Sequence, residues 1–257
     1  MVFQNDDVII PGIVRELGFT LEDARDYAII GCQEITGSGN DYSCANSVCP
    51  PHASIHYSSI LAMALNDGKN PMNGHQSPIH TGFLYEMEDF SQVQQAWSRL
   101  AEYYLRAQVS LNNYLEYLVQ YHTPHAILSI SLDGCMESGK DCTAGGAKYN
   151  SYGGTATGLA TVADSLSAIK YLCYDNHFVD RKTMYDAVMA NWEGYEELRQ
   201  KVIHDAPHFG NADQNADAMM RWVLEQYYGF TKKCYSKRAK VFKAGLYGAA
   251  DHVGQGY

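Results

Sequence analysis

The sequence lacks long apolar runs and an excess of basic residues, and each absence excludes a class of protein. Apolar stretches such as residues 126–132 are short and interrupted by serine, far below the roughly 20 residues of a membrane-spanning helix. The formal net charge is -10, whereas nucleic acids and anionic membranes attract positive surfaces. We therefore expect neither as a partner. Residues 1–7 lack the basic and apolar segments of a secretory signal, so a cytoplasmic location is expected.

The sequence also lacks any CxxC pair. Its seven cysteines are an odd number, and without a secretory signal they predict no disulfide framework. Cys44 and Cys49 stand at the outer limit of zinc-ligand spacing, and no second close pair follows them. Most of these cysteines are expected to be reduced thiols that fill the core as small apolar side chains.

Enough apolar material is present for a folded core. Apolar residues make up 46% of the chain and charged residues 19%, a composition that argues against a disordered protein. The length of 257 residues suits one large domain or two small ones. We find neither an internal repeat nor a low-complexity segment.

Periodicity predicts one long helix. From Val93 to Leu118, apolar residues recur at alternating steps of four and three, including Leu111, which keeps one helix face apolar. Asp89 can cap the start of this helix, and Pro124 ends the segment.

Local patterns predict the other elements. They are strands over 27–30 and 126–132, helices over 54–65, 159–172, 183–203 and 212–228, and a glycine-rich loop over 134–158. Strands mixed with helices indicate an α/β class. Because two strands cannot close a sheet alone, we expect the chain to be part of a larger structure.

The candidate chemistry lies in DYAIIGCQEITGSG, residues 26–39. An apolar strand leads into a loop that contains Cys32 and Glu34. Side chains two positions apart point the same way in extended backbone, so a sulfur and a carboxylate can share one cavity. One can then abstract a hydrogen atom while the other accepts a proton. Taken alone, this pattern is more typical of a buried cysteine beside a surface glutamate.

Further motifs accompany this loop in a fixed order. They are EDARDY at 22–27, ALNDG at 64–68, CMESGKDCTAGGAKYN at 135–150, ADSL at 163–166 with AIK at 168–170, and APHFGN at 206–211 followed by Asp217. With the GCQE segment, they make the chain similar to the pyruvate formate-lyase-like, or glycyl radical enzyme, superfamily. The resemblance runs from Glu22 to Asp217.

The resemblance implies a fold and a chemistry. The family fold is a ten-stranded α/β barrel with surrounding helices, and residues 1–257 would form one partial catalytic domain, the incomplete second half-barrel, with the cysteine loop near 31–39. Cys32 would be the thiyl radical site and Glu34 the base that deprotonates a small organic substrate. This chain would bind no cofactor directly. The glycyl radical would lie outside it, installed by an activating enzyme that uses S-adenosylmethionine and an iron–sulfur cluster. Family members are commonly dimers, so a homodimer is possible.

Departures from the family pattern narrow the reaction. Gln33 and Ile35 replace the usual Val and Pro, a second loop cysteine is missing, and Glu34 is kept. These features favour a lyase that eliminates water or an amine, or a decarboxylase, over acyl transfer or arylsuccinate synthesis. The R-V-x-G-[YF] radical motif is missing, since residues 254–257 lack its arginine. We expect an internal fragment without the N-terminal half-barrel and the C-terminal glycyl radical domain, inactive by itself.

Two other functions stay open: an inactive structural fragment of such an enzyme, and a thiol hydrolase that pairs Cys32 with a histidine. His52 and His56 have a metal-ligand spacing, but no carboxylate completes the set, so structural or substrate contacts are expected for them. Glu137 and Asp141 flank a glycine-rich turn, where capping roles are the common ones.

Overall fold

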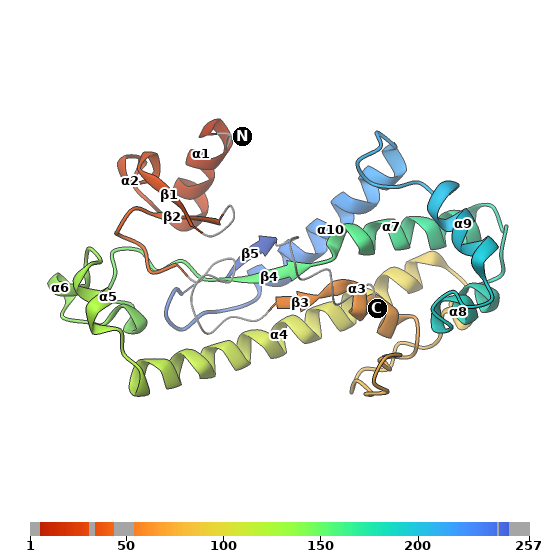
Figure 1. The fold of residues 1–257 in the computed structure, drawn as a ribbon, viewed down its shortest axis with the longest axis horizontal. Coiled ribbons are helices and arrows are strands. Elements are labelled where there is room, and N and C mark those ends of the chain that lie inside the picture. The colour runs from red at the N-terminus through yellow and green to blue at the C-terminus, as the bar shows by residue number, and fades with distance from the viewer. Residues whose placement is uncertain (1–5, 31–33, 44–53, 241, 247–257) are drawn as a thin grey trace. The chain divides into compact units, whose positions relative to one another are not determined.

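The computed structural model describes residues 6–30, 34–43, 54–240 and 242–246; the side chains of Glu34 and Ser54 are not described. Figure 1 shows the elements along the chain. They are α1 (Asp6–Leu17), α2 (Leu21–Arg25), β1 (Tyr27–Ile30), β2 (Glu34–Gly37), β3 (Ser54–His56), α3 (Tyr57–Ala64), η2 (Leu84–Glu86), α4 (Phe90–His122), α5 (Ala126–Ile130), α6 (Cys135–Ser138), η3 (Cys142–Ala144), β4 (Gly153–Thr157), α7 (Leu159–Ile169), the π-helix η4 (Lys170–Asp175), α8 (Arg181–Met189), α9 (Glu196–His204), α10 (Gln214–Lys232) and β5 (Lys243–Leu246).

The strands form two small sheets, and the chain divides into two compact units. β1 pairs with β2, and a second sheet has the order β3-β4-β5. The first unit contains residues 1–54, 106–155 and 231–247, and the second contains residues 55–105, 156–230 and 248–257. The long helix α4 therefore contributes its first half to the second unit and the remainder to the first.

In the second unit, α4 buries the predicted apolar face. Val93, Trp97 and Leu100 have no exposed surface, and the Trp97 ring lies 6.1 Å from the ring of the buried Tyr57 on α3. The predicted cap is confirmed as well, because the Asp89 carboxylate accepts a hydrogen bond from the Ser91 N–H at 2.7 Å. Trp97 and Tyr57 thus bring two large aromatic rings into this core.

In the first unit, α4 departs from the predicted pattern. Leu111 and Tyr114, expected on the buried face, are 53% and 59% exposed. The residues buried instead include Gln108, Asn112 and Glu116, spaced four apart on one face of the helix. The predicted apolar face was wrong here because Glu116 turns inward and pairs with the buried side chain of Arg238.

The predicted strand over 126–132 was wrong, since residues 126–130 form α5. The Ser129 N–H and hydroxyl both donate to the His125 carbonyl, at 2.8 Å each, which fixes a helical turn. Ile127 and Ile130 are 85% and 68% exposed, so the run is not buried as a core strand would be. A short apolar run does not distinguish strand from helix by its periodicity.

Other boundaries also differ from the predictions. The helix expected over 183–203 is broken into α8 and α9, because Asn191 and Trp192 adopt left-handed backbone with φ of 50° and 67°. Residues 54–56 form β3 rather than the first turn of α3, and the loop expected over 134–158 contains α6, η3 and β4. The helix expected over 159–172 begins as predicted but continues as the π-helix η4.

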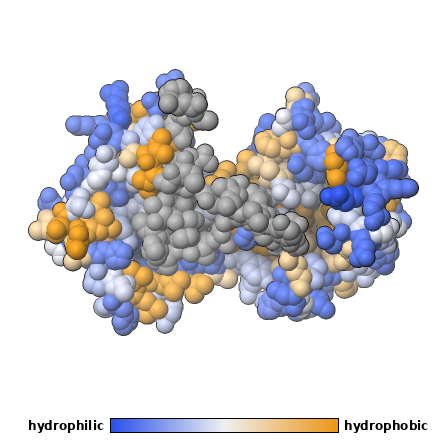
Figure 2. All heavy atoms as spheres, in the orientation of Figure 1, coloured by the Kyte–Doolittle hydropathy of each residue, from blue (hydrophilic) through white to orange (hydrophobic). Residues whose placement is uncertain are grey.

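An apolar surface patch lies on α5 and α6. Figure 2 shows side chains of high hydropathy gathered over these two helices. Ile127, Leu128, Ile130 and Met136 are 40–85% exposed. Within the described ranges, no helix combines the length and the apolar character that crossing a membrane requires.

Candidate active site

The GCQE motif lies between two paired strands. β1 and β2 are antiparallel, with Tyr27 opposite Gly37 and Ile30 opposite Glu34. The strand predicted over 27–30 is therefore confirmed. Residues 31–33 join the two strands, and Cys32 lies outside the described residues. Only the backbone of Glu34 is described, so the shared cavity for the Cys32 sulfur and the Glu34 carboxylate stays a prediction.

The hairpin lies beside α1 in the first unit (Figure 1), and an apolar cluster joins the two. Ile13, Phe19 and Ala24 are buried there, and Tyr27 and Ile35 of the hairpin pack on them. The Tyr27 hydroxyl also donates to Asp6 Oδ1 at 2.7 Å. One residue of each strand thus anchors the hairpin to this cluster.

A single carboxylate connects the two ends of the hairpin. Asp23 lies in α2, just before β1, and Asn40 follows β2. Asp23 Oδ1 accepts a hydrogen bond from Asn40 Nδ2 at 3.1 Å. Its Oδ2 accepts from the Tyr149 hydroxyl at 2.5 Å and from the Thr20 hydroxyl at 2.7 Å, and pairs with Lys148 Nζ at 2.8 Å. The Lys148 ammonium and the Tyr149 hydroxyl hold the pKa of the Asp23 carboxyl well below its usual range.

The segment 149–151 runs beside the chain that leaves the hairpin. The Tyr149 N–H donates to the Asn40 carbonyl at 2.9 Å, and the Tyr42 N–H donates to the Tyr149 carbonyl at 3.1 Å. The Ser151 N–H then donates to Asp41 Oδ1 at 2.9 Å. The motif KYN at 148–150 therefore has a structural explanation, because its residues support the exit of the hairpin.

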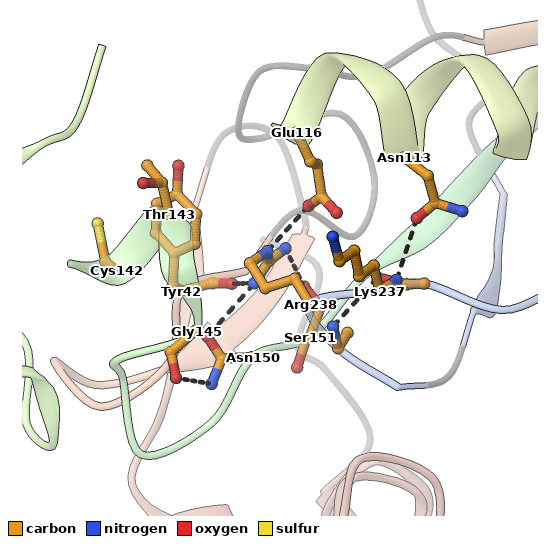
Figure 3. Close-up of polar contacts among 12 residues, drawn as sticks. Tyr42, Asn113, Glu116, Cys142, Thr143, Gly145, Asn150, Ser151, Lys237 and Arg238 are labelled. Carbon is orange, nitrogen blue, oxygen red and sulfur yellow. Dashed lines mark hydrogen bonds and ion pairs between the residues drawn. The ribbon is translucent and has the colours of Figure 1, made fainter. Parts of the chain in front are cut away.

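Arg238 completes this support, as Figure 3 shows. Its Nε donates to Glu116 Oε1 at 2.8 Å and its Nη1 to the Tyr42 carbonyl at 2.9 Å. Longer bonds of 3.4 Å reach Asn150 Oδ1 and the Ser151 carbonyl. The guanidinium thus joins α4, the hairpin exit and the chain before β4.

Burial dominates the electrostatics beside this arginine. Asp41 is only 6% exposed, and desolvation raises the pKa of its carboxyl, although the Ser151 N–H and the Arg238 charge act in the opposite direction. Among the described residues, Asp41 Oδ2 and Glu116 Oε2 have no hydrogen-bond partner.

Two further sequence candidates, Glu137 and Asp141, cap short turns. Glu137 accepts from the Gly134 N–H at 2.9 Å, and Asp141 accepts from the Thr143 N–H at 2.9 Å, so the capping roles expected for both are confirmed. His56 precedes α3, and His52 lies outside the described residues. Across the described part of the chain, no cluster of three or more His, Cys, Asp or Glu is placed to hold a metal ion. Cys135, Cys142 and Cys173 are buried, as predicted.

Two cavities lie in the second unit and contain no hairpin residue. One of about 280 Å³ is lined by Lys170, Trp222 and neighbouring residues, and an apolar one of about 200 Å³ is lined by Leu61, Met184 and Trp192 among others. Sequence reasoning missed Asn40 and Arg238, because no motif marks either. Tyr149 was visible within the KYN motif, but only as part of a resemblance.

Comparisons with known proteins agree on one family. Residues 1–256 match a family model described as pyruvate formate lyase-like. The chain is 33% identical over 253 residues to (2S)-3-sulfopropanediol dehydratase of Klebsiella oxytoca, covering 98% of this chain and 30% of that protein.

Solved structures share the fold. The glycerol-bound B12-independent glycerol dehydratase of Clostridium butyricum superposes with a TM-score of 0.85 at 30% identity, covering 95% of this chain and 30% of that one. A glycyl radical enzyme from Archaeoglobus fulgidus gives 0.81 at 28% identity, covering 93% and 30%. The predicted α/β class and incomplete barrel are confirmed by these similarities, and the chain spans about 30% of the length of the relatives it matches.

Proposed function

Because this chain belongs to the pyruvate formate lyase-like family, we propose that it carries the thiyl-radical centre of a glycyl radical lyase. Cys32 is the residue that exchanges hydrogen atoms with substrate, and Glu34 is the base. The supporting observation is the β1–β2 hairpin, whose strands bracket the GCQE motif and whose two ends are connected through the Asp23 carboxylate. A rigidly supported loop is what a reactive sulfur needs.

The proposed chemistry balances over one cycle. A glycyl radical supplied from outside this chain removes the hydrogen atom of the Cys32 thiol. The sulfur then takes a hydrogen atom from a substrate carbon, while the Glu34 carboxylate accepts the proton of the hydroxyl on that carbon. The neighbouring carbon–heteroatom bond breaks, the leaving group departs with the bonding electron pair, and the proton held by Glu34 passes to it, which restores the carboxylate. The product radical recovers a hydrogen atom from the Cys32 thiol, which regenerates the sulfur radical.

The separate roles of Cys32 in hydrogen-atom transfer and of Glu34 in proton transfer indicate a substrate class. A base beside the sulfur suits a small molecule with a hydroxyl next to a leaving group, and the relatives named above are dehydratases of a sulfopropanediol and of glycerol. We therefore place elimination ahead of decarboxylation. A radical activating enzyme that uses S-adenosylmethionine is the proposed partner, and pairing of two copies is proposed by family analogy alone.

The chain spans about 30% of the length of these relatives, so the test places it within a whole relative. A segment exchange tests the proposal: the matching region of the Klebsiella oxytoca dehydratase is replaced by this chain, and the chimaera is activated without oxygen by that enzyme's own activating enzyme. Electron paramagnetic resonance measures the glycyl radical, and mass spectrometry measures the product. Cys32→Ala should keep the radical and lose all product, and Glu34→Gln should lose about a hundredfold or more in rate.

Cys234→Ala serves as the matched control and should turn over normally. Unchanged product formation in Cys32→Ala would remove the thiyl assignment. The unsubstituted chimaera is given the sulfopropanediol and, separately, a carboxylic acid of similar size. If it holds the glycyl radical yet converts neither compound, the alternative of an inactive structural segment is favoured. A hydrolase is recognised by product formation that needs no radical.

A further inference from the structure

The β1–β2 hairpin is attached to its unit at both ends by side chains to which the sequence motifs assign no role. We propose that Tyr149 and Arg238 are positioning residues, which fix the entry and the exit of the hairpin and thereby the place of Cys32. The effect of these residues on catalysis rests on the proposed function. Their effect on the hairpin does not depend on that function.

At the entry, Tyr149 contributes through its hydroxyl. The hydroxyl donates to Asp23 Oδ2 at 2.5 Å and accepts from the Thr20 N–H at 3.1 Å. The ring is held independently, because it stacks on Phe19 with centroids 3.8 Å apart. Substitution by Phe therefore removes the polar link and leaves the packing in place. Hydrogen bonds to an ionised carboxylate are stronger than neutral ones, so the link is a firm one.

Asp23 transmits this link to the other end of the hairpin. The carboxylate that accepts from Tyr149 also accepts from Asn40, which follows β2. Lys148 adds its charge to the same oxygen that Tyr149 contacts. The entry and the exit of the hairpin are thus fixed relative to each other by one carboxylate, and both are fixed to the segment 148–149.

At the exit, Arg238 acts through the shape of its guanidinium. Three of its nitrogens donate in different directions, to Glu116, to the Tyr42 carbonyl and to the Ser151 carbonyl. Its side chain is only 4% exposed. A lysine keeps the charge but cannot reproduce a planar fork with several fixed donors. Arg238→Lys therefore separates the positioning role from the charge.

Positioning matters here because atom transfer needs reacting atoms about 3–3.5 Å apart. Loosening either end of the hairpin would therefore widen the range of positions open to Cys32. Both residues act through the hairpin and neither is proposed to touch substrate.

Hydrogen exchange of the 257-residue protein tests the inference without any turnover. Tyr149→Phe and Arg238→Lys are compared with two controls in the second unit. Tyr185→Phe removes a hydroxyl that donates to Asn66 Oδ1 at 2.8 Å, and Arg181→Lys alters an arginine bonded to the Met87 carbonyl. Mass spectrometry follows peptides that cover residues 27–37, and urea unfolding measures global stability.

We expect exchange over 27–37 to become about tenfold faster in the two site variants, with no change in that region in the controls. Similar losses of global stability in all four variants would show that the local effect is not general weakening. Should Arg238→Lys not fold, Asn40→Ala must give the same acceleration, since it cuts the Asp23 link. Hairpin exchange that is unchanged in Tyr149→Phe, or equally fast in the controls, overturns the inference.

Different experiments test the thiyl role of Cys32 and the positioning role of Tyr149 and Arg238. Cys32→Ala leaves every positioning contact in place and should not alter exchange. An active Cys32→Ala chimaera would remove the thiyl assignment and leave the positioning role standing, whereas unchanged exchange in Tyr149→Phe would remove only the positioning role. In the chimaera, Tyr149→Phe should lower kcat and leave KM unchanged.

Discussion

Arg238 and Glu116 form an ion pair that is almost wholly withdrawn from water. Nε and Oε1 lie 2.8 Å apart, and the side chains are 4% and 9% exposed. The arginine also faces the rings of Tyr42 and Tyr152, at 4.9 and 5.5 Å, which adds cation–π attraction. A charge held in this way depends on its partner, because burial without neutralisation is costly.

Glu116→Ala should therefore lower the free energy of unfolding by about 3–5 kcal/mol, since it removes the carboxylate that pairs with the buried Arg238 guanidinium. Urea denaturation followed by circular dichroism measures the change. Asp186→Ala is the matched control, because the Lys182–Asp186 pair on α8 is exposed on both sides and should cost less than about 1 kcal/mol. Equal effects of the two substitutions would show that the Arg238 site is hydrated.

Asp23→Asn should change how stability depends on pH. The folded-state pKa of Asp23 is depressed, first by Lys148 and then by Tyr149, so its contribution is present above the unfolded value of about 3.9 and is lost as the pH falls through the folded value. The Tm difference between parent and variant should be largest near pH 6 and shrink toward about pH 2. The pKa of Asp41 is raised instead, but Asp41 is present in both proteins, so its effect cancels in the Tm difference. A difference that stays constant with pH would contradict this role.

Gly146→Ala should be strongly unfavourable. A Cβ at this position would lie 2.0 Å from the Lys140 carbonyl oxygen, which belongs to the backbone and cannot swing away. We expect a loss of about 1–3 kcal/mol or more in the free energy of unfolding. Gly12→Ala in α1 is the control of opposite sign, since nothing lies within 4 Å of its Cβ and alanine favours the helix by about 0.5–1 kcal/mol. Chemical denaturation of both variants makes the comparison.

The cysteines should react with iodoacetamide in an order set by burial. Cys173 is 4% exposed, and desolvation raises the pKa of its thiol to about 12. Burial also raises the pKa of Cys135 and Cys142. Cys234 is only partly buried. Peptide mass spectrometry should therefore find Cys234 alkylated well before these three, and urea should remove the difference. Rapid native labelling of Cys173 would contradict its packing.

Sequence patterns identified the elements whose burial follows from their own apolar periodicity. The first half of α4 and the strand at 27–30 were predictable, because their apolar residues pack as their periodicity indicates. Residues 126–130 were not, since a short apolar run fits a strand as well as a helix, and the Ser129 bond to Asp141 reaches outside the run. The break near Trp192 was also hidden, because left-handed backbone in a bulky residue carries no compositional signal.

In the candidate site, too, some residues could be predicted from the sequence and others could not. Cys32 and Glu34 were found through motif order, and their geometry stays a prediction. The framework around them depends on contacts across more than 100 residues, such as Tyr149 with Asp23 and Arg238 with Glu116. Contacts of that span leave no periodic trace in a single sequence, so only coordinates bring them together.

The second half of α4 turns Asn112 and Glu116 inward and presents Leu111, Tyr114, Tyr117 and Tyr121 to water. This reverses the usual amphipathic arrangement of a surface helix, and wide apolar exposure of this kind promotes self-association. The practical limit on concentrating the protein will therefore be set by this helix face rather than by its net charge of -10. A fluorescent dye that senses apolar surface should bind the fully folded chain, and light scattering should rise steeply with concentration and with added salt.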